Sequence, residues 1–203
     1  MKHLLLLLTL PFVLGITLAH GAVIVVDPSQ DLQSVVNSAN SGDELVLADG
    51  IYNEAVIYNK NLNIRNLSGT PQITSLKVSN SSAICEIKNI RITTDLNATS
   101  GMMRMLNCQI SGSINATTSS IELIKTTVTG NANFGGGGNF ERTTILVQSV
   151  IGEKLTCETQ NSKILYSLIR HAKISGSSEI VGNEFNGRNL KAVGILVEGT
   201  NTT

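Results

Sequence analysis

The chain has 203 residues, with 15 basic and 15 acidic side chains and a formal net charge of zero. A nucleic-acid-binding protein normally presents a basic face, and this balance gives no support for one. Charged residues make up only 15% of the chain, whereas hydrophobic residues make up 41%, which argues against disorder. Many Ile, Leu and Val residues beside Asn, Ser, Thr and Gly are typical of short β-strands joined by tight turns.

The N-terminal segment, residues 1–21, is predicted to be a signal peptide. A short basic start precedes the apolar run Leu4–Leu18, and small residues follow, so we place cleavage between Ala19 and Ala22. The alternatives are a buried N-terminal strand or an uncleaved anchor. The protein is therefore expected to be secreted, periplasmic or at the cell surface. Residues 22–203 are expected to form one domain without a membrane span.

A capping helix is predicted over about residues 28–40. Its start is Asp27-Pro28-Ser29-Gln30, its stop is Ser41-Gly42, and its apolar stripe consists of Leu32, Val35, Val36 and Ala39. A helix at this place would cover the open end of a repetitive fold.

The stretch from Gly42 to Asn66 holds the most specific motif of the chain. It contains Gly42-Asp43, a short strand from Leu45 to Leu47, the turn Gly50-Ile51-Tyr52, and Lys60-Asn61. With the helix before it, this stretch resembles the N-terminal start of the pectin-lyase-like β-helix superfamily. The resemblance covers about residues 27–66, and the remaining coils match only as a generic repeat. It implies the fold, and carbohydrate as the class of ligand.

A repeat of about 18 residues runs through the middle of the chain. Six segments read IKNIRI, MLNCQI, LIKTTV, LVQSVI, ILYSLI and IVGNEF, and they end at Ile92, Ile110, Val128, Ile151, Ile169 and Phe185, with spacings of 18, 18, 23, 18 and 16. One coil of a parallel β-helix fits this period, because equivalent side chains of successive coils stack in ladders about 4.8 Å apart. We therefore predict an all-β fold, a right-handed parallel β-helix with these residues in its core.

Two further positions of the repeat support the same register. The outward residue before each segment is in turn Glu86, Arg104, Glu122, Ile145, Lys163 and Glu179, so opposite charges are expected on adjacent coils, although chance alternation is the alternative. The residue two before each segment's end is Ile90, Cys108, Thr126, Ser149, Ser167 and Asn183. Its small polar members are expected to bond the backbone near a corner.

Cys85, Cys108 and Cys157 fall on three different ladders and three different coils in this register. We therefore predict buried free thiols and no disulfide. Their spacing fits no metal motif, and no metal or cofactor is predicted. A catalytic cysteine would need a histidine nearby, and only His171 could serve.

The one long interval of the repeat contains the four-glycine run Gly135–Gly138, which is predicted to protrude as a loop. Loops on a rigid scaffold often carry function. The candidate ligand-binding residues are Phe134, Asn139 and Phe140, because a phenyl ring can stack on a sugar. The alternative is that both phenylalanines point inward and the glycines merely relieve a turn.

Catalysis finds little support in the pattern of carboxylates. Members of the resembling superfamily include pectate lyases, which need carboxylates to hold calcium, and polygalacturonases, which need two carboxylates at the scissile bond. No aspartate follows Asp95, and the later glutamates do not recur at adjacent ladder positions that would bring two together.

The sequence therefore favours a secreted, non-catalytic β-helix module for binding or surface structure, with carbohydrate as the ligand. The alternative is a carbohydrate-active enzyme, a polysaccharide lyase or glycoside hydrolase, with an unrecognised site. An ice-binding solenoid is disfavoured because Thr127-Val128-Thr129 does not recur in other coils. No capping helix is recognised after Ile195 and Val197. We expect that end to pair with another copy, to be covered by the tail, or to continue in a longer parent protein.

Overall fold

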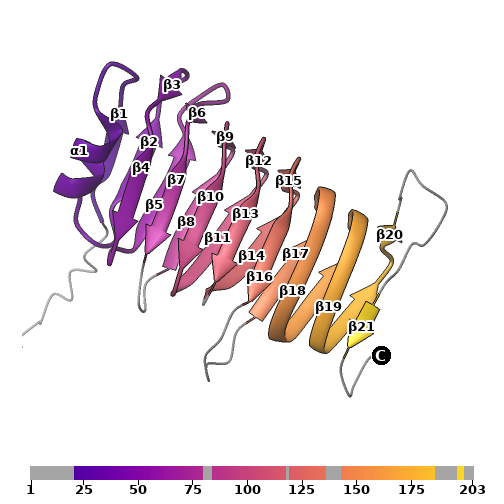
Figure 1. The fold of residues 1–203 in the computed structure, drawn as a ribbon. Helices are drawn as coiled ribbons and strands as arrows, with labels where there is room; N and C mark the ends of the chain where they lie inside the picture. Colours follow the sequence, from indigo (N-terminus) through magenta and orange to yellow (C-terminus); the bar gives the residue numbers. More distant parts are fainter. Residues whose placement is uncertain (1–20, 80–83, 118, 136–142, 186–195, 199–203) are drawn as a thin grey trace, which may run out of the picture.

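The computed structural model describes residues 21–79, 84–117, 119–135, 143–185 and 196–198. Within these ranges the chain forms a right-handed parallel β-helix of about eight turns with one short helix at its N-terminal end, which confirms the predicted fold (Figure 1). All but the last residue of the predicted signal segment lies outside the described residues. Among those residues, no helix has the length and apolar character needed to cross a membrane.

Each coil of the solenoid crosses three faces, which we call A, B and C. Face A contains β1 (Val23–Val26), β2 (Glu44–Leu47), β5 (Leu62–Asn66), β8 (Ile84–Lys88), β11 (Met102–Leu106), β14 (Ser120–Ile124), β17 (Thr143–Val147), and the last parts of β18 (Val150–Leu165) and β19 (Leu168–Val181). Face B contains β3 (Ile51–Tyr52), β6 (Gln72–Ile73), β9 (Arg91–Ile92), β12 (Gln109–Ile110), β15 (Thr127–Val128), the first parts of β18 and β19, and β20 (Glu184–Phe185).

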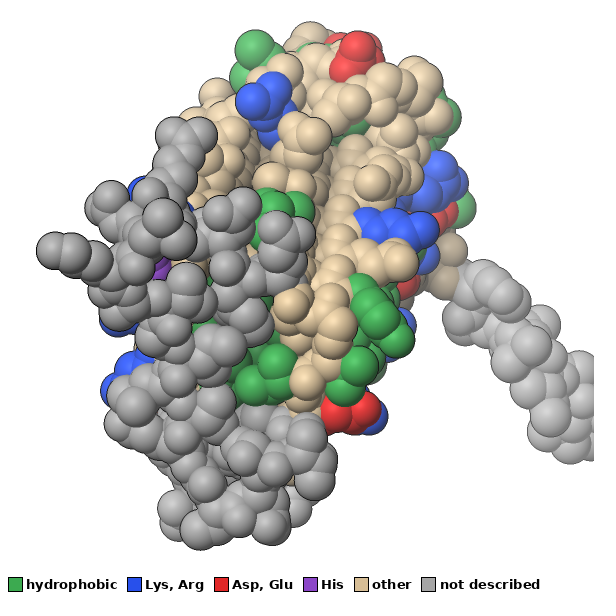
Figure 2. Space-filling model, turned by 90° about the vertical axis from the view of Figure 1, so that its right-hand side faces the viewer, with side chains coloured by type: hydrophobic (Ala, Val, Ile, Leu, Met, Phe, Trp, Pro, Cys, Tyr) green, Lys and Arg blue, Asp and Glu red, His purple; other side chains and the backbone are tan. Residues whose placement is uncertain are grey.

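Face C contains β4 (Ala55–Tyr58), β7 (Leu76–Ser79), β10 (Leu96–Thr99), β13 (Ile114–Thr117), β16 (Ala132–Gly135), the middle parts of β18 and β19, and β21 (Leu196–Glu198). Every pairing between these strands is parallel, so the chain crosses A, B and C in turn and then rises by one rung. Figure 2 views the molecule from the end that carries β19, β20 and β21, where apolar side chains lie beside acidic and basic ones.

The pairing of the strands reproduces the predicted ladders. The strand register joins Ile92, Ile110, Val128, Ile151, Ile169 and Phe185 on face B, and joins Ile87, Met105, Leu123, Leu146, Ile164 and Ile180 on face A. The ladder members from Ile92 to Ile169 are at most 1% exposed. Each such aliphatic side chain contributes about 1.5–3 kcal/mol through its burial. The core is therefore one continuous column inside the three faces.

The outward charge ladder is also confirmed in its register. Arg104 lies between Glu86 and Glu122, and Lys163 lies beside Glu179. Arg104 forms its ion pair with Glu122, while Glu86 pairs with Lys88 of its own strand at 3.2 Å. The Lys163 ammonium lies 2.8 Å from the Glu179 carboxylate. Because these groups are partly solvated, each pair contributes only about 0–1 kcal/mol and serves mainly to align the rungs.

A sharp corner joins face A to face B in each coil. Six corner residues have φ between 49° and 62°, in the left-handed region: Asn89, Asn107, Lys125, Gln148, Tyr166 and Gly182. The residue that follows each of the first five is buried in the corner; it is Ile90 in the first of these coils and a small residue in the other four. Its backbone N–H donates to the side chain one coil later: Cys108 to Thr126 Oγ1 (3.4 Å), Thr126 to Ser149 Oγ (3.2 Å), Ser149 to Ser167 Oγ (3.2 Å) and Ser167 to Asn183 Oδ1 (2.8 Å). The predicted bonding of small polar groups to the corner backbone is thus confirmed.

The capping helix α1 spans Leu32–Ser38 and is shorter than the predicted range of 28–40. The residues before it form a turn closed by the Gln30 N–H and the Asp27 carbonyl (2.9 Å), and the Asp27 carboxylate accepts from Ser29. The true N-cap is Asp31, whose carboxylate accepts from the backbone of Ser34 at 3.0 Å. An aspartate that bonds its own local backbone favours a turn over a helix, which explains the later start.

Three residues of the stretch from Gly42 to Asn66 close the first coils. The Lys60 ammonium donates to three carbonyls at the end of α1, those of Val36, Asn37 and Ala39, at 2.7–2.9 Å. The buried Asp43 carboxylate accepts from the backbone of Ala22 and Asn40, both at 2.7 Å. The Tyr52 hydroxyl lies 2.8 Å from the Val26 carbonyl oxygen. These polar groups satisfy backbone atoms that the first coil would otherwise leave unpaired.

All three cysteines are free and buried, as predicted. Cys85 stacks on Met103, Cys157 stacks on Phe134, and the Cys108 thiol lies 3.4 Å from the Ile87 carbonyl oxygen. Burial raises the pKa of Cys85 to about 12 and that of Cys108 to about 11. Because the thiolate is the reactive form, these two groups are kept unreactive near neutral pH.

The corner relay gives a stability prediction. Ser149→Ala removes the acceptor for the buried Thr126 N–H, and we expect the free energy of unfolding to fall by about 1–3 kcal/mol. The matched control is Thr129→Ala, an exposed hydroxyl one coil away, which should change it by less than about 0.5 kcal/mol. Urea denaturation followed by circular dichroism measures both, and equal effects of the two substitutions would contradict the relay.

The thiols give a second prediction. In the native protein near pH 8, a thiol reagent such as dithionitrobenzoate should leave the three cysteines unmodified for minutes, because each is buried. In urea all three should react at once. Rapid modification of any cysteine in the native protein would show that its coil opens readily or that the register is incorrect.

Candidate functional site

Of the three predicted ligand-binding residues, Phe134 lies in the core. It is 1% exposed in β16 and stands between Ala116 and Cys157 in the inward ladder of face C. These two small neighbours leave room for a phenyl ring, and strand alternation turns Asn133 outward instead. Phe134 therefore points inward, as the alternative interpretation held, and its ring is not available to stack on a ligand at the surface. Asn139 and Phe140 lie outside the described residues.

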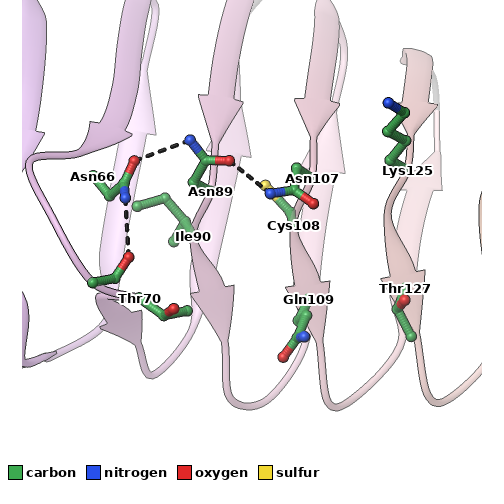
Figure 3. Close-up of a pocket in the computed structure, with 10 residues that line it drawn as sticks. Asn66, Thr70, Asn89, Ile90, Asn107, Cys108, Gln109, Lys125 and Thr127 are labelled. Carbon is green, nitrogen blue, oxygen red and sulfur yellow. Dashed lines mark hydrogen bonds between the residues drawn. The ribbon is translucent and has the colours of Figure 1, made fainter.

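A groove follows the corner between faces A and B over four coils. Its volume is about 330 Å³, and it is lined by Asn66, Gly69, Thr70, Asn89, Ile90, Asn107, Cys108, Gln109, Lys125 and Thr127 (Figure 3). We call it the amide groove after its four amide side chains. No acidic side chain is among its lining residues.

The asparagines of the amide groove form a hydrogen-bonded ladder. Asn107 Nδ2 donates to Asn89 Oδ1 (2.8 Å), Asn89 Nδ2 donates to Asn66 Oδ1 (3.0 Å), and Asn66 Nδ2 donates to the Gly69 carbonyl (2.9 Å), as Figure 3 shows. Asparagine tolerates the left-handed conformation better than most residues, so it suits Asn89 and Asn107 at the corner. The ladder holds each amide in a set orientation, one coil above the next.

The other polar groups of the groove remain open for binding. In the part of the chain that the structure describes, the side chains of Gln109, Lys125 and Thr127 make no hydrogen bond or ion pair, and all three are exposed. Arg91 lies beside Gln109 in the outward ladder of face B and, within the same ranges, is likewise without a side-chain partner. The groove thus presents one cationic group, Lys125, beside amide and hydroxyl groups, with Arg91 next to it, an arrangement that can bind a polar or acidic ligand.

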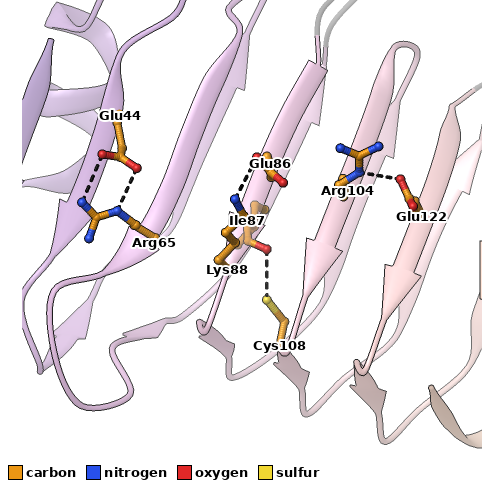
Figure 4. Close-up of polar contacts among 8 residues, drawn as sticks. All are labelled: Glu44, Arg65, Glu86, Ile87, Lys88, Arg104, Cys108 and Glu122. Atoms are coloured by element: carbon orange, nitrogen blue, oxygen red, sulfur yellow. Dashed lines mark hydrogen bonds and ion pairs between the residues drawn. The ribbon is translucent and has the colours of Figure 1, made fainter. Parts of the chain in front are cut away.

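Most of the paired glutamates outside the groove join neighbouring coils, and one, Glu86, pairs within its own strand. Six of them pair with a basic side chain, as the pairs Arg65–Glu44, Lys88–Glu86, Arg104–Glu122, Lys163–Glu179, Arg170–Glu153 and Lys173–Glu158 (three of these are drawn in Figure 4). The guanidinium of Arg65 hydrogen-bonds Glu44 and lowers the pKa of that carboxyl. A glutamate held ionised in this way is suited to pairing rather than to donating a proton.

A second hollow, of about 520 Å³, lies beside the capping helix and is lined by Asp31, Gln33, Asn53, Glu54, Val56 and Thr74. Gln33 fixes one wall, because its side-chain amide accepts from the Val56 N–H (2.6 Å) and donates to the Val56 carbonyl (3.1 Å). Asp31 is the helix N-cap, and hydrogen bonds from Ser34 lower the pKa of its carboxyl. The carboxylates of Asp31 and Glu54 thus border this hollow, and that of Asp31 already caps the helix.

Metal and nucleophile candidates are few in the described ranges. Within those ranges no three His, Cys, Asp or Glu side chains gather to hold a metal ion. His171 is exposed, and its neighbour Arg170 is paired with Glu153 at 2.6 Å. No cysteine lies in register with His171, which pairs with Lys154.

Sequence reasoning singled out the small corner residues but missed the amide groove beside them. The available signal was the residue immediately before the corner position, which along the groove is Asn89, Asn107 and Lys125 in successive coils. Asparagine at the same place in two successive coils indicates a left-handed corner with a stacked amide. What the pattern could not give was the distance between this corner and the outward side chains of face B.

Comparison with known proteins found no match: no family model, no curated protein and no solved structure matches the chain.

Proposed function

We propose that this protein is a secreted, non-catalytic β-helix module that binds an extended carbohydrate along the amide groove. The observation that carries the proposal is a set of exposed side chains without partners in the described ranges, Gln109, Lys125 and Thr127, beside an ordered asparagine ladder. Successive coils lie about 4.8 Å apart, so the groove offers similar groups at regular steps along its length. A chain of repeating sugar units can satisfy such a row with its hydroxyl groups.

The charge of the groove favours an acidic polysaccharide over a neutral one. Lys125 lines the groove and Arg91 stands next to it, while no acidic side chain lines it. A uronate carboxylate placed between these two cations would form charge-assisted hydrogen bonds, which are the stronger kind. The resemblance of residues 27–66 to the pectin-lyase-like superfamily supports the same ligand class. The resemblance itself rests on residues that close the first coil, such as Lys60 and Asp43.

The second candidate is a carbohydrate-active enzyme, a polysaccharide lyase or glycoside hydrolase. The observation in its favour is the hollow that both Asp31 and Glu54 line. Against a general acid at Asp31 stands its lowered pKa, which keeps the carboxyl ionised. If this hollow is catalytic, Glu54→Gln abolishes polysaccharide cleavage. Cleavage that survives this substitution places the catalytic site elsewhere, whereas the absence of cleavage by the wild type favours the binding module.

Groove substitutions provide the test of the proposed function. Gln109→Ala combined with Lys125→Ala removes one amide and one ammonium group, and we expect affinity for polygalacturonate or alginate to fall roughly tenfold or more. The matched control is Asn63→Ala combined with Lys77→Ala, which removes the same two kinds of exposed group from faces A and C. Isothermal titration calorimetry measures both.

The ligand panel includes neutral glucans and mannans, and circular dichroism confirms that each variant is folded. The proposal predicts tighter binding of the acidic chains at low salt. It fails if the folded wild type binds none of these polysaccharides, or if the control weakens binding as much as the groove variant does.

A further inference from the structure

The outer surface of face A carries an unbroken row of aliphatic side chains. In register from one coil to the next, this outer aliphatic ladder consists of Leu106, Ile124, Val147, Leu165 and Val181. The first four are partly exposed, and Val181 is 42% exposed. In a strand with one buried face, outward positions are normally polar. Five successive apolar residues on the solvent side therefore indicate a surface that meets another apolar surface.

The outward charge ladder runs parallel to the outer aliphatic ladder on the same strands. From β11 to β19 its members are Arg104, Glu122, Ile145, Lys163 and Glu179, so the charges read plus, minus, neutral, plus, minus. The side chains of Lys163 and Glu179 are 57% and 45% exposed, which leaves both able to reach a partner. Reversing this order exchanges every plus for a minus.

That reversal is what a two-fold axis along β17 produces. Such an axis lays a second copy face to face with the first, with the two solenoids antiparallel and the strands aligned. Arg104 then lies opposite Glu179 of the second copy, and Glu122 lies opposite its Lys163. Ile145, in the rung on the axis, meets its own counterpart. Opposite charges face each other at all four charged positions, as a self-complementary two-fold interface requires.

The outer aliphatic ladder matches itself under the same operation. Leu106 lies opposite Val181 of the second copy, Ile124 lies opposite its Leu165, and Val147 meets Val147. A two-fold axis along the solenoid gives no such match: over the charge ladder it places Arg104 on Arg104 and each other charge on itself, and between the two ladders it places charges on aliphatic side chains. The order of charges therefore selects the antiparallel arrangement.

We propose that face A from β11 to β19 is a self-association surface on which a second copy of this chain docks antiparallel. Five rungs about 4.8 Å apart and strands of five residues give about 400 Å² per copy, or about 800 Å² in total. This area is below the roughly 1,200 Å² of stable complexes, so the dimer is weak and forms at high micromolar concentration. The site lies beside the amide groove and does not depend on carbohydrate binding.

Charge reversal within one chain tests the arrangement without disturbing the fold. Arg104→Glu with Glu122→Lys keeps the ion pair inside the chain but sets like charges against each other across the two-fold axis. Lys163→Glu with Glu179→Lys does the same in the other half of the ladder. Each double variant should dimerise roughly tenfold or more weakly than the wild type. Mixing the two variants restores opposite charges at every contact, so the mixture should form a heterodimer.

Sedimentation velocity from about 10 µM to about 1 mM measures these states, and circular dichroism confirms that each variant is folded. A second arm uses Val147→Glu, which brings two carboxylates together on the axis, with Val150→Glu on face B as the matched control. Val147→Glu should abolish the dimer, and Val150→Glu should leave it unchanged. The proposal is overturned if the wild type stays monomeric, if the double variants dimerise like the wild type, or if their mixture does not associate. Growth into species larger than a dimer, unaffected by these changes, would indicate end-to-end pairing and would also overturn it.

Discussion

Backbone hydrogen bonds between successive coils are the constraint on which the rest of this structure depends. Except at the two ends of the solenoid, each strand of the three faces pairs in parallel with the strand one coil before and one coil after it. Parallel pairing in register places every side chain over its equivalent, at the spacing between rungs. Stability is then a sum of contacts between neighbouring coils, and a residue type favoured at one position is favoured again one coil later.

The same constraint explains why polar side chains occur in rows that run from coil to coil. Hydroxyls such as those of Thr126 and Ser149 satisfy the N–H groups of the corner, and the amides of Asn89 and Asn107 bond one another along it. Charged pairs such as Arg104–Glu122 align the rungs on the outside. Both surfaces that we propose as binding sites likewise consist of side chains repeated in register from coil to coil. A solenoid can build a long surface in this way with few loops.

The N-terminal cap shows why a specific motif can be silent on function. Lys60, Asp43 and Tyr52 each bond backbone atoms at the start of the solenoid. An unpaired backbone group inside the protein costs about as much as a lost hydrogen bond, so these residues have a structural reason to be present. These residues are therefore explained by the closure of the first coil, and the proposed ligand class depends mainly on the groups of the amide groove.

The sequence by itself determined the coil, its register and its core, because the period of the apolar residues is imposed by stacking and can be counted along the chain. It also determined that Cys85, Cys108 and Cys157 stay apart, since they fall on different ladders. Only the tertiary structure decided that Phe134 is buried, because this depends on the small neighbours Ala116 and Cys157 in adjacent coils. The amide groove likewise could be recognised only in the tertiary structure. Its walls belong to two faces whose separation is set by the corner geometry, and a one-dimensional repeat contains no such distance.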